Sequence, residues 1–99
     1  MAAYMIASFD ITDPKAFEAY VPGMMPILLR YDPEVLVADY GATALEGECR
    51  RVNVVIRFKT GEALNGFYDD PEYQPLKELR LRTTANSTCL VAKEFVLPA

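Results

Sequence analysis

Two tyrosines and an arginine in the second half of the chain have the types and spacing of a small ligand site. Tyr73 and Arg80 are seven residues apart and share one face of a predicted helix, and Tyr68 ends the helical piece before it. A tyrosine hydroxyl can donate or accept a hydrogen bond, and an arginine can hold a carboxylate with two parallel donors. The same residues would equally suit a core with surface hydroxyls and an arginine paired with a nearby acid.

A second candidate is the pair formed by Asp10 and Arg57. Strand alternation places both side chains on the sheet face that no helix covers, near the same ends of two neighbouring strands. We expect them to lie within salt-bridge distance, because an unpaired charge buried on that face would be costly. They would form a polar anchor on the open sheet face, or an ordinary ion pair of an interface or its rim.

The other residues that could do chemistry form less specific patterns. Glu46 could act as a general base if burial raised its pKa, but Glu46-Gly47 is also typical of a turn. Acids around Asp70-Pro71 could meet a hard metal ion, but such acids are common at helix starts, so no metal site is predicted. Cys49 and Cys89 lie far apart and form no CxxC pair, and we expect two free thiols.

The chain contains no histidine. This absence removes the commonest general base near neutral pH, the usual zinc ligand and the usual proximal haem ligand. It also excludes Ser-His-Asp and Cys-His mechanisms within one chain. The five glycines are isolated from one another, so no glycine-rich phosphate loop is present. We predict no cofactor.

The composition fits one globular domain over residues 1–99. Apolar residues make up 52% of the chain and charged residues 24%, which is an ordinary balance for a folded domain. The net charge of −4 opposes binding to phosphate backbones, so nucleic acid is an unexpected partner. No apolar run reaches the roughly 20 residues of a membrane span, and no signal peptide precedes the first strand. We expect no membrane association and a cytoplasmic location.

The elements that would position these residues follow a simple order. Short runs of alternating or continuous apolar residues predict strands over residues 3–11, 34–40, 51–59 and 87–95. A helix capped by Thr12 or Asp13 follows the first strand, with a kink or break expected where Pro22 and Pro26 each remove a backbone donor. Thr60 caps the next helix, and a further helical piece runs from about residue 72 to 82.

The order strand, helix, strand, strand, helix, strand predicts an α+β fold of ferredoxin-like βαββαβ type. It consists of a four-stranded antiparallel sheet with the helices on one face. The first and third strands are expected to be central and parallel to each other. The face without helices mixes apolar and polar residues, and a second copy packed against it by two-fold symmetry would cover it. The sequence therefore predicts a homodimer.

Several motifs resemble those of the domain of unknown function 1330 family. They are Asp13-Pro14, Tyr20, Tyr31, Leu45-Glu46-Gly47, Arg51-Val52, Phe58, residues 67–74 (FYDDPEYQ) and Arg80. The resemblance covers nearly the whole chain and implies a dimeric α+β barrel, without implying a reaction. The chain departs from the family pattern at Ala38-Asp39-Tyr40, where an Arg-Gly-Gly is usual, at Asp32-Pro33, where Gly-Gly is common, and at Arg57, which replaces a glutamate.

Two hypotheses for function follow. The first is a small-molecule enzyme of the dimeric α+β barrel kind that acts without a histidine-held metal or haem, with proton transfer by Tyr, Asp or Glu. The second is a non-catalytic homodimer that binds a small molecule or stabilises a partner. For the enzyme, the ligand would lie between the sheet and the helices, in a cleft lined by Tyr20, Tyr40, Tyr68, Tyr73 and Arg80. A filled space between sheet and helices, with every polar group paired, would favour the non-catalytic protein. Analogy of fold favours the first hypothesis.

Overall fold

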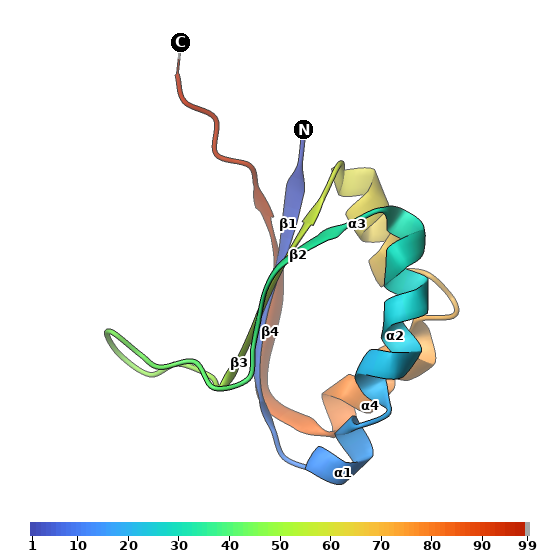
Figure 1. Cartoon of the computed structure of the whole chain (residues 1–99), viewed down its shortest axis with the longest axis vertical. Coiled ribbons are helices and arrows are strands. Elements are labelled where there is room, and N and C mark those ends of the chain that lie inside the picture. Colours follow the sequence, from blue (N-terminus) through green and yellow to red (C-terminus); the bar gives the residue numbers. More distant parts are fainter. Residues whose placement is uncertain (99) are drawn as a thin grey trace.

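A computed structural model describes residues 1–98 and shows one sheet with a layer of helices on one side of it (Figure 1). The elements in chain order are β1 (Ala3–Ile11), α1 (Pro14–Phe17), α2 (Tyr20–Leu28), the 3-10 turn η1 (Leu29–Tyr31), β2 (Glu34–Asp39), β3 (Val52–Phe58), α3 (Gly61–Tyr68), α4 (Gln74–Arg82) and β4 (Thr84–Lys93). This order confirms the predicted βαββαβ fold, with each helical crossover divided into two pieces.

The sheet has the strand order β2-β3-β1-β4, and each neighbouring pair is antiparallel. β1 and β3 are central, as predicted, but the prediction that they are parallel is wrong. The α1–α2 crossover makes β1 and β2 run in the same direction, and the β2–β3 hairpin then reverses the chain. β3 therefore runs against β1, with Phe9 opposite Val52 and Tyr4 opposite Arg57.

The helical segment between β1 and β2 breaks before Pro22 and Pro26 rather than at these prolines. The Asp13 carboxylate caps α1 by accepting a hydrogen bond from the Ala16 backbone N–H, as predicted, and α1 ends at Phe17. α2 starts at Tyr20, so Pro22 lies in its first turn, where a backbone N–H has no helical partner to lose. Pro26 is accommodated inside α2. Thr60 caps α3 as predicted, with its hydroxyl accepting from the Ala63 N–H.

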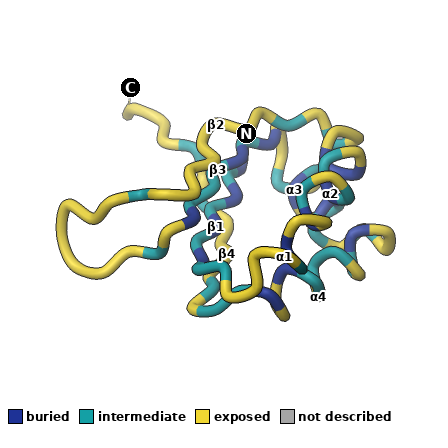
Figure 2. The backbone as a smooth tube through the Cα atoms, turned by 60° about the horizontal axis from the view of Figure 1, so that its bottom comes forward, coloured by how far each residue is buried: buried dark blue, intermediate teal, exposed yellow. Residues whose placement is uncertain are grey.

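The core lies between the helices and one face of the sheet (Figure 2). On β1, Met5, Ala7 and Phe9 are buried, whereas the alternate residues are only partly covered. This is the alternation expected of a strand with one face covered by helices. Phe58 of β3 and Leu28 of α2 are fully buried. The predicted division of the central strands into a core face and an open face is confirmed.

The other sheet face carries no helix (Figure 1). The register places Ile6, Val55 and Leu90 side by side on this face, with Ser8 and Asn53 hydrogen-bonded next to them. The β2–β3 connection over residues 40–51 and the segment after β4 extend away from the helix layer. Within residues 1–98, every helix is too short to cross a membrane.

Candidate functional site

A cavity of about 110 Å³ lies between the core face of the sheet and the helices. Its walls are mostly apolar and include aromatic side chains from β1, α1 and α3, namely Phe9, Phe17 and Phe67. Met24 and Met25 of α2 and small or branched residues of β2 and β3 complete the apolar lining. Its polar groups come from Tyr20, Tyr40, Tyr73, Arg80 and Cys89. Such a space is the kind of concave, apolar site that small molecules occupy.

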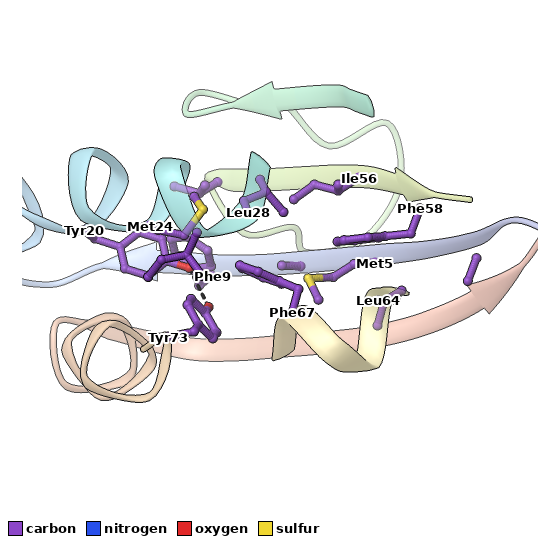
Figure 3. Packing of buried hydrophobic residues seen from close by; sticks show 14 of the residues in the cluster. Met5, Phe9, Tyr20, Met24, Leu28, Ile56, Phe58, Leu64, Phe67 and Tyr73 are labelled. Carbon is purple, nitrogen blue, oxygen red and sulfur yellow. Dashed lines mark hydrogen bonds between the residues drawn. The ribbon is translucent and has the colours of Figure 1, made fainter. Parts of the chain in front are cut away.

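Tyr20 and Tyr73 form a hydrogen-bonded pair in the cavity wall (Figure 3). Tyr20 is the first residue of α2 and Tyr73 immediately precedes α4, so the pair joins the two crossovers. Their hydroxyl oxygens are 2.7 Å apart, and their rings meet edge to face. Burial and the adjoining Tyr73 hydroxyl raise the pKa of Tyr20 well above its ordinary value. The Tyr20 hydroxyl therefore keeps its proton at neutral pH.

Arg80 of α4 is the charged residue of the cavity wall, and only 4% of its surface is exposed. Its guanidinium lies beside the hydroxyls of Tyr20 and Tyr73 and donates to Ser87 Oγ at 3.4 Å. Among residues 1–98, no carboxylate oxygen lies within 4 Å of it, since the ion pairs found there involve other basic residues. A buried arginine without a carboxylate partner is unusual.

A bulge in β4 positions the residues that face Arg80 from the sheet. The pairing of β1 with β4 shifts between Ser8 and Asp10, where β4 contains one extra residue. Asn86 adopts a left-handed conformation there, with a φ of 56°. Ser87 follows directly and reaches Arg80. Beyond the bulge, the exposed Cys89 lies opposite Ala7 and lines the cavity, where partial removal from water raises the pKa of its thiol.

The structure brings together four of the five residues predicted to bind a ligand: Tyr20, Tyr40, Tyr73 and Arg80 all line the cavity. Tyr40 follows β2 and is half exposed. The fifth, Tyr68, lies outside this cavity; its ring is 6.3 Å from that of Tyr73 and is covered by the Lys77 ammonium.

Sequence reasoning missed Ser87 and Cys89 as members of this site. Cys89 is paired with Ala7, so strand alternation places it on the core face of the sheet, and this alternation could have identified it. Ser87 carries no such signal, because it reaches Arg80 from an irregular part of β4.

The predicted salt bridge between Asp10 and Arg57 is wrong. Because β1 and β3 are antiparallel, the two residues lie at opposite ends of the sheet. The Asp10 carboxylate accepts from the Arg51 backbone N–H and from Asn86, and these hydrogen bonds lower the pKa of Asp10. Arg57 instead pairs with Glu34 at 3.1 Å and with Glu94 at 3.6 Å.

The other candidate residues from the sequence are Glu46, the acids around Asp70 and the two cysteines. Glu46 lies in the exposed 40–51 connection, next to Gly47 with its φ of 68°, and does not line the cavity. Asp70 accepts a 2.6 Å hydrogen bond from the Tyr31 hydroxyl. Within residues 1–98, no three His, Cys, Asp or Glu side chains are grouped closely enough to hold a metal ion. Cys49 and Cys89 are free thiols, as predicted.

These features define the class of protein as an α+β domain of ferredoxin-like fold with a largely apolar cavity beneath its helices, whose wall contains a few polar groups. The family model of the domain of unknown function DUF1330 matches residues 2–94, and the chain belongs to this family. The resemblance noted from the sequence is thereby confirmed. No curated protein is significantly similar in sequence.

Solved structures support the fold assignment at low sequence identity. A protein of unknown function from Rhodopseudomonas palustris matches with a TM-score of 0.81 and 16% identity, over 97% of this chain and 84% of the other. A dimeric ferredoxin-like protein from Thermobifida fusca matches with a TM-score of 0.66 and 16% identity, over 93% and 90%. SnoaB, a cofactor-independent oxygenase from Streptomyces nogalater, matches with a TM-score of 0.61 and 17% identity, over 99% and 98%.

Proposed function

We propose that this protein is a homodimer that binds a small, largely apolar molecule in the cavity between its sheet and its helices. One observation carries the ligand site: an apolar cavity of about 110 Å³ whose wall includes a buried arginine beside a pair of tyrosines. Protein interiors are normally packed with few voids, and polar groups that converge on an apolar cavity are typical of ligand sites.

The open face of the sheet provides the grounds for proposing a homodimer. Ile6, Val55 and Leu90 form an apolar strip there, and Leu90 keeps 48% of its surface exposed. Phe95 and Leu97 in the segment after β4 are also largely exposed. A second copy that covers this face would remove these apolar surfaces from water. The Thermobifida fusca structure of this fold is described as dimeric.

Catalysis is the first of two candidate roles for the cavity, and the Tyr20–Tyr73 pair favours it. One hydroxyl of the pair donates to the other, so the accepting tyrosine has its own hydrogen left for a ligand oxygen. Among the described residues 1–98, no Asp or Glu lines the cavity, so the tyrosine hydroxyls and the Cys89 thiol are the groups there that could transfer a proton. This role is that of an enzyme without a histidine-held metal or haem, and SnoaB of the same fold is described as a cofactor-independent oxygenase.

Non-catalytic binding is the alternative, and the raised pKa of Tyr20 favours it. A tyrosine that resists ionisation is a poor general base. Aerobic incubation with a bound compound, followed by mass spectrometry, separates the two roles. If the wild-type protein converts many equivalents of the compound and Tyr73→Phe converts fewer, the result supports the enzyme. Recovery of the unchanged compound supports the binding protein.

A thermal-shift screen of small aromatic compounds and small carboxylates tests the ligand site itself. A ligand present at ten times its Kd stabilises the folded state by about 1.4 kcal/mol, which raises the melting temperature of a domain of this size by roughly 6–11 °C. Ala38→Phe, which adds bulk at the cavity wall, should abolish the shift. Ala44→Phe in the exposed connection is the matched control and should retain it. A broad panel without any shift would remove the support for a ligand site.

A further inference from the structure

The surroundings of Arg80 identify the kind of group that the cavity lacks. The guanidinium is always charged in proteins, and burial of a charge is costly unless an opposite charge accompanies it. Arg80 is 4% exposed, and the side chains that interact with its guanidinium include the tyrosine hydroxyls, Ser87 Oγ and the Cys89 thiol. These are polar partners, but none of them is a carboxylate.

The protein's own groups do not supply the missing negative charge. Burial raises the pKa of the Tyr20 hydroxyl, and partial removal from water raises the pKa of the more exposed Cys89 thiol, so both stay neutral near neutral pH. The carboxylates found in ion pairs within residues 1–98 are bound to Arg30, Arg57 or Lys59. The accepting hydroxyl of the tyrosine pair adds a further donor hydrogen at the same place. The polar part of the cavity wall around Arg80 thus offers hydrogen-bond donors but no anionic acceptor.

The rest of the wall sets the size and shape of the ligand. Phe9, Phe17 and Phe67 provide flat aromatic surfaces, and Met24 provides a deformable one. The cavity volume of about 110 Å³ is somewhat below the roughly 150 Å³ of an engineered apolar cavity that holds benzene. One aromatic ring is therefore the upper limit of size, with its substituent against the polar groups of the wall, and two fused rings exceed the space.

Resting on the proposed function of the cavity, we infer that its ligand is a single-ring aromatic monocarboxylate, or an acid of that size and shape. The ring lies among the phenylalanines. The carboxylate accepts hydrogen bonds from the Arg80 guanidinium and from the Tyr20–Tyr73 pair. The charge and the size of such a ligand can be varied separately in simple probe compounds.

Benzoate and benzamide test the charge, because they share size and shape but only benzoate is anionic. Isothermal titration calorimetry of the wild-type protein should give a Kd for benzoate at least about tenfold lower than that for benzamide, since charge-assisted hydrogen bonds are the stronger kind. Arg80→Met should reduce the ratio of the two affinities to within about threefold of one. Arg82→Met, an exposed position of the same helix, is the control and should keep the full preference.

The possible outcomes separate this inference from the proposed function on which it rests. If benzamide binds as tightly as benzoate to the wild-type protein, the ligand site stands and the inference of an anionic ligand is overturned. If no compound of the wider thermal-shift panel binds, the ligand site itself fails. 2-Naphthoate tests the size and should bind more weakly than benzoate; tighter binding overturns the single-ring limit. The wild-type comparison decides the charge even if Arg80→Met does not fold.

Discussion

At the scale of single residues, Asp70 shows how one carboxylate can hold two segments together. It accepts a hydrogen bond from the Tyr31 hydroxyl after α2 and another from the Glu72 backbone N–H before α4. The Arg30 guanidinium lies 3.8 Å from Asp70 and also pairs with Glu72. From the sequence, Asp70 and Glu72 together with Asp69 are possible ligands of a metal ion, and the structure shows Asp70 and Glu72 as hydrogen-bond and ion-pair partners instead.

Asp70 also links stability to pH. The Tyr31 hydrogen bond, followed by that of the Glu72 N–H, holds the pKa of Asp70 below its ordinary value. A carboxyl whose pKa is lower in the folded state stabilises the fold above its unfolded pKa of about 3.9, and this stabilisation is lost as the pH falls through the folded pKa. Asp70→Asn should therefore lower the free energy of unfolding at pH 7, and the difference from wild type should shrink below about pH 4.

Urea unfolding at a series of pH values measures this difference. The neighbouring Asp69→Asn, at an exposed position, is the matched control and should follow the wild-type pH profile. A difference between Asp70→Asn and wild type that stays constant from neutral to acid pH would show that Asp70 acts through something other than its charge.

At the scale of elements, the bulge in β4 decides which residues reach the cavity. Asn86 holds a left-handed conformation in the bulge, and its side-chain amide donates to Asp10 at 3.2 Å. A residue with a Cβ loses about 1–2 kcal/mol in this conformation, whereas glycine does not and asparagine tolerates it. The shape of the bulge is thus set by the backbone preference of one residue together with its contact to β1.

Substitution of Asn86 separates these two contributions. Asn86→Ala loses the hydrogen bond and meets the left-handed penalty, so we expect it to lower the free energy of unfolding by about 1–2 kcal/mol. Asn86→Gly loses the same hydrogen bond without the penalty and should be the more stable of the two variants. Chemical denaturation of both proteins measures the order. Equal stabilities of the two variants would contradict an important role for the left-handed conformation.

The sequence predicted the elements and faces well because they follow from local patterns. The alternation of Val52, Ile56 and Phe58 with polar neighbours identified the core face of β3, and Thr60 marked the start of α3. The Asp10–Arg57 prediction failed because the direction of β3 was misjudged, although the connection order already implies an antiparallel pair.

The cavity was harder to predict than the elements. Arg80 and Tyr73 could be placed on one helix, but their meeting with Tyr20 depends on how the two crossovers pack. Ser87 reaches Arg80 through a bulge, and bulges leave little trace in the amino-acid pattern. Long-range packing therefore decided the composition of the site, whereas local periodicity decided the layers that enclose it.

At the scale of the whole molecule, the two proposals use opposite faces of the same sheet. The cavity lies on the helix-covered face, and the proposed dimer contact lies on the open face with Ile6, Val55 and Leu90. A stable interface needs roughly 800 Å² from each partner, and the 40–51 connection and the segment after β4 extend on the side of the open face, where they could add to the contact (Figure 1). A monomer in solution would thus leave the geometry of the cavity described above unchanged.

Leu90→Glu tests the dimer at the centre of this surface. Leu90 is opposite Ile6 on the open face, and because it is 48% exposed, its replacement should cost the isolated fold little. A charge buried without a partner in the interface would be costly, so the variant should sediment as an 11.1 kDa monomer where the wild type sediments at twice that mass. Leu29→Glu, 61% exposed in the helix layer, is the matched control and should remain dimeric. Sedimentation velocity at micromolar concentration distinguishes these species, and a monomeric wild type would overturn the proposed homodimer.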